Sequence, residues 1–305
     1  MLQSLYNGIS ALQAHQEYLN VVSNNLANVN TIGYKSARTN FQDSLSQTYV
    51  PPTSAGANVA GHNGIQIGLG SSVGTVLTNF TQGSLQSTGV PSDVAIEGNG
   101  FLRLRDPAQA ATYFYTRAGN LRVDEVGAQS FLVDANGMRV QGWNATAADT
   151  PNVAGGLVDM EVPPVLPSAG PPAVPATAQF LSYSIQSDGK IEGQFYDPPS
   201  VPFPNGQQIT STLGFIEMSN FPNPQALQKA GGNLYAYNAA AGTEIQASPG
   251  ASGTGTIRAG YIEMSNVDMA QEFTDMIRAQ RGLQANSRVI TTSDEVIQEL
   301  VQMKR

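Results

Sequence analysis

A seven-residue repeat of apolar side chains runs through residues 266–303, whose sequence is NVDMAQEFTDMIRAQRGLQANSRVITTSDEVIQELVQM. The members of the repeat are Met269, Met276, Leu283, Ile290 and Ile297. A strict heptad places these side chains along one side of an α-helix, as a seam that packs against another helix. Residues 265–268, Ser-Asn-Val-Asp, are typical of a capping box at the start of a helix. We therefore expect one long helix from about Asn266 to Met303.

A second long helix is predicted over about the first 28 residues of the chain, where apolar residues recur every three or four positions. These residues are Leu2, Leu5, Ile9, Leu12, Leu19 and Leu26, with Gln16 and Ser23 interrupting the series. Gly33 is available for the turn that ends this segment. A solitary helix with one narrow apolar stripe is marginal in water, so we expect each terminal helix to need a partner.

Asparagines gather at the end of the first predicted helix, at Asn24, Asn25, Asn28 and Asn30. Asparagine is a poor residue for a helix interior. One interpretation is a helix end that frays. The interpretation we favour is that the amide side chains form hydrogen bonds to adjacent subunits.

The middle of the chain changes to a two-residue period, which indicates antiparallel strands. Three pairs of apolar runs are joined by Asn99-Gly100, Asn136-Gly137 and Asp188-Gly189, which are strong hairpin signals. The expected fold class is therefore α+β. Long N- and C-terminal helices form a coiled-coil inner domain, and the middle is antiparallel and all-β.

Proline divides the middle further, because 11 of the 18 prolines fall in residues 151–204. We expect four parts, in this arrangement: a helical inner domain of residues 1–40 with 262–305; a linking loop at 41–64; a β-rich middle domain of residues 65–145 with 211–261; and a small proline-rich outer insertion at 146–210. The sequence GFIEMSN at 214–220 returns as GYIEMSN at 260–266. The similarity stops there, which favours two like strand ends over a duplicated domain.

Composition excludes several kinds of chemistry. The chain has no cysteine and only two histidines, so thiolate catalysis, disulfides and cysteine-ligated metals are excluded. Its 15 Lys and Arg against 23 Asp and Glu give a formal net charge of −8, which argues against a nucleic-acid surface. We find no signal-peptide pattern and no apolar run of membrane-spanning length. No catalytic, cofactor-binding or metal-binding residue is predicted.

Several motifs resemble those of one known family. They are SLYNGIS at 4–10, VVSNNLANVNTIGYK at 21–35, QGSLQSTG at 82–89, DVAIEGNGF at 93–101, YTRAGN at 115–120, and SNVD with MIRAQR at 265–268 and 276–281. Their order and content are similar to those of bacterial flagellar rod and hook proteins, and the match covers all but roughly residues 145–210. Within this family VQGW at 140–143 and residues 187–195 resemble hook sequences more than distal rod sequences.

The resemblance implies a structural protein rather than an enzyme. Its subunits would assemble into a helical tube whose inner layer is built from both terminal helices, with the β domain outside. The expected role is the flagellar hook, a flexible joint that passes torque from rod to filament; the alternative is the distal rod. Partners would be further copies of the chain, the distal rod, hook-cap and hook–filament junction proteins, and the flagellar export apparatus. Export would need no cleaved signal.

The residues expected at the subunit interface follow from the two helices. They are Leu5, Ile9, Leu12, Leu19, Asn24, Asn25, Leu26, Asn28, Met269, Met276, Leu283, Ile290 and Ile297.

Overall fold

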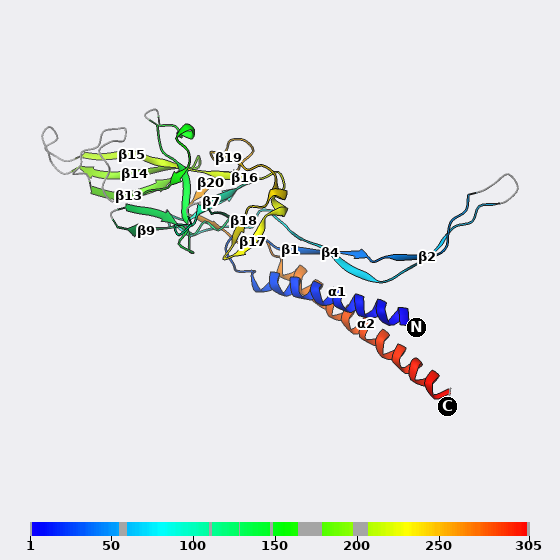
Figure 1. The fold of residues 1–305 in the computed structure, drawn as a ribbon. Helices are drawn as coiled ribbons and strands as arrows, with labels where there is room; N and C mark the ends of the chain where they lie inside the picture. The colour runs from blue at the N-terminus through cyan, green and yellow to red at the C-terminus, as the bar shows by residue number, and fades with distance from the viewer. Residues whose placement is uncertain are drawn as a thin grey trace. The chain divides into compact units, whose positions relative to one another are not determined.

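The computed structural model describes residues 2–54, 60–109, 112–127, 129–146, 149–163, 179–197 and 207–303 (Figure 1). The chain divides into two compact units. One, which we call the helical unit, comprises Met1–Val29, Ser36–Asn79 and Val267–Arg305. The other, the β unit, comprises Asn30–Lys35 and Phe80–Asn266. The β-rich body and the helices at both ends agree with the predicted mixture of α and β structure.

The helical unit contains both predicted helices, α1 (Leu2–Ala27) and α2 (Met269–Met303). The start of α2 differs from the expected capping box. The Asp268 carboxylate accepts hydrogen bonds from the backbone N–H groups of Ala270 and Gln271, at 2.9 and 3.3 Å. Asp268 is therefore the N-cap, and its negative charge also lies at the positive end of the helix dipole.

The segment expected as a linking loop at 41–64 is mostly β structure in its described part. It belongs to a long two-stranded ribbon made of β1 (Ala37–Asp43), β2 (Ser46–Val50), β3 (Ile65–Gly68) and β4 (Ser71–Thr78). Strand β1 pairs with β4 and β2 pairs with β3, all antiparallel. The pairing resumes beyond Pro51-Pro52 with a bridge between Thr53 and His62. The ribbon lies in the helical unit, which also takes residues 65–78 out of the predicted middle domain.

The β unit is built from the remaining described strands. They are β5 (Leu85–Ser87), β6 (Val94–Glu97), β7 (Phe101–Arg105), β8 (Tyr113–Thr116), β9 (Arg122–Val126), β10 (Gln129–Val133), β11 (Arg139–Trp143), β12 (Val158–Asp159), β13 (Gln179–Ile185), β14 (Lys190–Asp197), β15 (Gln207–Ile216), β16 (Met218–Asn220), β17 (Gln228–Gly231), β18 (Leu234–Ala236), β19 (Ile245–Ala247), β20 (Thr256–Ala259) and β21 (Tyr261–Glu263). Thirteen of them form one sheet whose main path is β13-β14-β15-β11-β7-β8-β18-β17, and β20 with β6 and β21 with β5 form two small antiparallel pairs.

Two of the three predicted hairpins are confirmed. The turn at Asn136-Gly137 joins β10 to β11, and the turn at Asp188-Gly189 joins β13 to β14. The hairpin predicted at Asn99-Gly100 is wrong, because β6 pairs with β20 while β7 pairs with β8, β11 and β16. Gly98 and Gly100 both have positive φ, so the chain crosses here from one sheet to another instead of reversing.

The main core of the β unit draws on the large sheet and on the small pair of β6 with β20. It is formed by aliphatic side chains that alternate along the strands, among them Leu102, Leu104, Ile191 and Ile216. A second cluster is aromatic and includes Phe101, Tyr115, Phe221 and Tyr235. Strands β13–β15 continue the large sheet through the pairing of β15 with β11, so the described part of the expected outer insertion shares this sheet. Residues 164–178 and 198–206 of that insertion lie outside the described residues.

Candidate assembly site

The two terminal helices pack against each other in antiparallel orientation. Three contacts give the register. A Cβ built on Gly8 would lie 3.3 Å from the Cγ1 atom of Ile290, and one built on Gly282 would lie 2.7 Å from the His15 ring. The third is a hydrogen bond of 3.0 Å from the Asn25 amide to the Glu272 carboxylate. As the α1 number rises the α2 number falls, so α1 and α2 run in opposite directions.

The face of α1 that makes these contacts repeats a leucine every seven residues. Leu5, Leu12, Leu19 and Leu26 are half-buried in it, as the sequence predicted. Between them lie Gly8, His15 and Val22. Ile9 is 43% exposed and belongs to the outer side of the helix. The three- and four-residue spacing predicts Ile9 in the seam, whereas the structure brings its neighbour Gly8 against Ile290.

The heptad on α2 lies on the matching side of that helix. Met276, Leu283, Ile290 and Ile297 are half-buried, and Ala279 is fully buried. Met269 is 53% exposed, because it sits in the first turn, beyond the end of the pairing. Gly282 lies against the imidazole of His15, which also lies 5.6 Å from the Phe41 ring.

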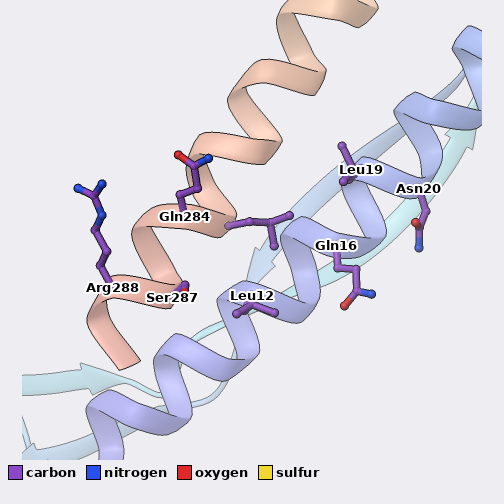
Figure 2. Close-up of a pocket in the computed structure, with 8 residues that line it drawn as sticks. Leu12, Gln16, Leu19, Asn20, Gln284, Ser287 and Arg288 are labelled. Atoms are coloured by element: carbon purple, nitrogen blue, oxygen red, sulfur yellow. The ribbon is translucent and has the colours of Figure 1, made fainter. Parts of the chain in front are cut away.

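An open groove of about 700 Å³ runs between the two helices (Figure 2). Its apolar lining residues are Leu12, Leu19 and Leu283. Its polar lining residues are Gln16, Asn20, Gln284, Ser287 and Arg288. The predicted seam residues are therefore shared between the helix pair and a surface that is open within one chain.

The asparagines at the end of α1 are engaged within their own chain. The Asn25 side chain is buried, donates to the Ala37 carbonyl at 2.8 Å and accepts from the Ala37 N–H at 2.9 Å. The Asn28 amide donates to the Asn24 carbonyl and side-chain oxygens at 2.9 and 3.0 Å. Within one chain the Asn25 amide therefore joins α1 to β1 and α2, and its contact with an adjacent subunit stays a prediction.

Other apolar side chains of the helical unit remain uncovered within a single chain. On the helices they are Tyr6, Ile9, Phe273, Ile277, Val296 and Val301; on the ribbon they are Leu45, Tyr49, Ile65, Ile67 and Val76. A two-stranded ribbon is marginally stable by itself in water. An extended apolar surface of this kind is typical of a protein–protein contact.

In the β unit, a buried ion cluster joins the segment after α1 to the segment before α2. The Lys35 ammonium lies 2.6 Å from the Glu263 carboxylate, and both side chains are completely buried. The second oxygen of Glu263 faces the Arg117 guanidinium at 3.6 Å. Lys35 also donates to the Thr81 carbonyl at 2.8 Å, and Glu263 accepts from the Gly83 N–H at 2.9 Å. Burial lowers the pKa of Lys35 despite the partly compensating carboxylate.

The other copy of the GxIEMSN motif also buries its glutamate. Glu217 and Glu244 each place a carboxylate oxygen 2.7 Å from the Ser219 hydroxyl. The Ser219 hydroxyl is the donor in both contacts, so its one proton is shared between two carboxyl groups. Arg103 pairs with Glu244 at 3.1 Å, and burial raises the pKa of Glu217 to about 8. Glu217 is therefore the member of the pair that holds a proton near neutral pH.

Sequence reasoning missed the ion cluster. The signal it had was the repeated motif, because the same Glu stands at the same place in both copies, as Glu217 and Glu263. Alternating apolar neighbours predict that both glutamates lie on strands. No local pattern shows that Glu263 meets Lys35, which is 228 positions away in the sequence.

The described residues contain no group of three or more His, Asp or Glu side chains that could hold a metal ion. Neither helix, over its described length, is long and apolar enough to span a membrane.

Three family models match successive parts of the chain. "Flagella basal body rod protein" matches residues 5–35, "Flagellar hook protein FlgE/F/G D1 domain" matches 95–193, and "Flagellar basal body rod FlgEFG protein C-terminal" matches 258–303. Lys35 and Glu263 thus fall inside the two terminal matches.

Individual relatives are similar over different lengths. The flagellar basal-body rod protein FlgG of Bacillus subtilis is 42% identical over 306 residues, covering all of both chains. The flagellar hook protein FlgE of Borreliella burgdorferi is 29% identical over an alignment of 449 residues that covers all of both. The hook protein FlgE of Treponema pallidum is 44% identical over 145 residues, which are 48% of this chain and 30% of that one.

The helix crossing predicts a coupling between Gly282 and His15. Alanine is favoured over glycine by about 1 kcal/mol inside a helix. In a His15→Ala background, Gly282→Ala should add about that much to the free energy of unfolding. With His15 present the gain should disappear, because the new Cβ meets the ring. Urea unfolding, monitored by the circular dichroism of the helices, measures the free energy of unfolding in both backgrounds. Equal gains in the two backgrounds would contradict the contact.

The ion cluster predicts a large effect of Glu263→Gln. The substitution keeps the shape but leaves the buried Lys35 ammonium without its nearest opposite charge, which costs about 3–5 kcal/mol of unfolding free energy. Glu97→Gln is the control, since Glu97 lies 3.9 Å from Arg258 and both side chains are exposed. Its expected effect is under about 1 kcal/mol. Equal losses in the two variants, measured by urea unfolding, would refute the assignment.

Glu217 predicts a pH dependence of stability. Its ordinary pKa of 4.5 applies in the unfolded chain, and about 8 applies in the folded chain. Between these values only the folded state holds the proton, so stability falls as pH rises from about 4.5 to 8. Glu244, Arg103, Ser219 and Tyr115 surround the group.

Glu217→Gln has no such proton to lose. Between pH 5 and pH 8 the free energy of unfolding of the unmodified chain should fall. That of the Glu217→Gln variant should fall by about 4 kcal/mol less over the same range. Denaturant titrations at the two pH values supply the comparison. Parallel pH profiles would show that Glu217 does not hold the proton.

Proposed function

The chain belongs to the family of bacterial flagellar rod and hook proteins, and from this we propose that it is a distal rod subunit of the flagellar basal body. It is a structural component of the flagellum. In our proposal its copies form a rigid helical tube that transmits rotation, with the paired helices α1 and α2 in the inner layer and the β unit outside. Its partners would be further copies of itself, the hook subunit that follows it, and the flagellar export apparatus.

One observation carries the choice of rod over hook. The similarity to the Bacillus subtilis rod protein is 42% over 306 aligned residues for a chain of 305, so it runs through both chains with almost no length difference. The alignment with the Borreliella burgdorferi hook protein reaches 449 positions at 29% identity. The hook protein therefore carries long stretches that this chain lacks. The hook assignment expected from residues 140–143 and 187–195 rested on two short segments, and full-length similarity outweighs them.

The hook remains a second candidate because of one local similarity. The Treponema pallidum hook protein is 44% identical over 145 residues. That match covers about half of this chain. Terminal and β-domain motifs that the two proteins share explain it equally as well as a shared role would.

Self-assembly is supported by the surfaces that one chain leaves uncovered. The helices pair along one face only, and apolar side chains on their outer faces and on the ribbon stay exposed. Identical subunits that meet through different surfaces build open helical polymers. In this arrangement one neighbouring copy covers Ile9 and the ribbon. A second neighbouring copy covers the groove that Leu12, Leu19 and Leu283 line.

Ile9 separates folding from polymerisation, because it is exposed in the single chain. Ile9→Asp should leave the free energy of unfolding within about 0.5 kcal/mol, as is usual for surface substitutions. The same variant should fail to form long assemblies in concentration-dependent sedimentation. Ile9→Val, which keeps an apolar surface, is the matched control and should assemble. Normal assemblies from Ile9→Asp would remove Ile9 from the interface.

Deletion of the gene distinguishes the two candidate roles. We expect purified basal bodies from the deletion strain to end in a truncated rod when viewed by electron microscopy. A complete rod with rings but without a hook would instead assign the chain to the hook. Intact rods and hooks would contradict both assignments. Restoring the unmodified gene should restore the missing structure in either case.

A further inference from the structure

The chain has four lysines, and the structure describes the side chains of three, at 35, 190 and 229. Their surroundings differ in exposure and in charged neighbours. An amine attacks an electrophile only in its unprotonated form, so both access and pKa matter. Comparison of the three sites gives a definite order of reactivity.

Two of the lysines are protected. Lys35 is completely buried against Glu263, so no reagent in solution reaches it while the fold is intact. Lys190 lies within ion-pair distance of two carboxylates, those of Asp149 and Glu192. These hydrogen bonds raise the pKa of Lys190 and hold its ammonium protonated. Modification of either lysine would also leave a carboxylate without its partner.

Lys229 differs from both of these lysines, because it is neither buried nor paired with a carboxylate of the described residues. It lies on β17, at one end of the main path of the large sheet, and its side chain is exposed. Its ammonium lies 5.0 Å above the ring of Tyr34, and no carboxylate in the described part of the chain forms an ion pair with it. The protein atoms around the amine lower the pKa of Lys229, with no nearby charge opposing them.

We propose that Lys229 is an acyl-acceptor site of the folded chain, the described lysine that small acyl phosphates modify first. The unprotonated Nζ attacks the acyl carbon of the acyl phosphate. A C–N bond forms, the C–O bond to phosphate breaks, inorganic phosphate leaves with the bonding electrons, and the amine proton passes to solvent. No other co-reactant is needed.

The product fits the site as well as the reactant does. An acetylated Lys229 is neutral, and its flat amide can rest on the Tyr34 ring that the ammonium occupied. No ion pair is broken. The modification does remove a positive charge from the edge of the sheet, where lysine discourages pairing with a strand of another chain.

Acetyl phosphate is the probe that tests the proposal. The purified chain is treated near neutral pH, and adducts are followed over time by peptide mass mapping with a protease that does not cut at lysine. Because Lys229 is exposed and has no ion-pair partner among the described residues, whereas two carboxylates hold Lys190 protonated, the initial rate at Lys229 should exceed that at Lys190 severalfold. Lys35 should stay unmodified. A rate at Lys190 equal to or above that at Lys229 would overturn the proposal.

Two controls tie the order of reactivity to the fold. In urea the three lysines share one ordinary pKa, so their rates should agree within about twofold. In the folded chain, Asp149→Asn with Glu192→Gln removes the carboxylates beside Lys190 and should raise its rate toward that of Lys229. Lys229→Arg should remove the first adduct. An unchanged preference in urea, or an unchanged Lys190 rate in the double variant, would show that these surroundings do not set the order.

Discussion

The buried carboxylate of Glu263 is the interaction on which the two ends of the chain depend. It neutralises Lys35, which follows α1 in the sequence, and it stands six residues before the first residue of α2. A carboxylate and an ammonium with no exposed surface are tolerated only as a pair. The backbone N–H of Gly33 also donates to the Glu263 carbonyl at 2.8 Å. One residue thus fixes the points where both helical segments leave the β unit, by charge and by backbone.

The helical unit obeys a different constraint, which is close approach. Gly8, Ala279 and Gly282 keep the two helices near each other, and larger apolar residues between them line the open groove. Apolar area is therefore divided between the folded chain and surfaces left for other copies. A subunit whose stability used all of its apolar area internally would have little left for assembly.

Periodicity in the sequence predicted what depends on local order. It placed both helices within a few residues, the half-buried column on α2, and two hairpins whose turns carry Asn-Gly or Asp-Gly. It failed where distant segments decide the outcome. Gly8 takes the place in the helix pair that the spacing gave to Ile9, and Asn25 meets Ala37 and Glu272 within its own chain. The ribbon was missed since its strands pair across the prolines, and the ion cluster was missed since its members are 228 positions apart.

The antiparallel pairing of α1 with α2 has a consequence for the order of folding. Asn25 and Glu272 are separated by 247 positions, so almost the whole chain must exist before α1 can meet its partner. Contacts of such long range are slow to form, because the entropy of closing the loop is lost before the contact is gained. The Lys35–Glu263 pair forms late for the same reason. During synthesis α1 therefore stays without its helical partner until the last segment of the chain emerges, and a solitary amphipathic helix is marginally stable in water.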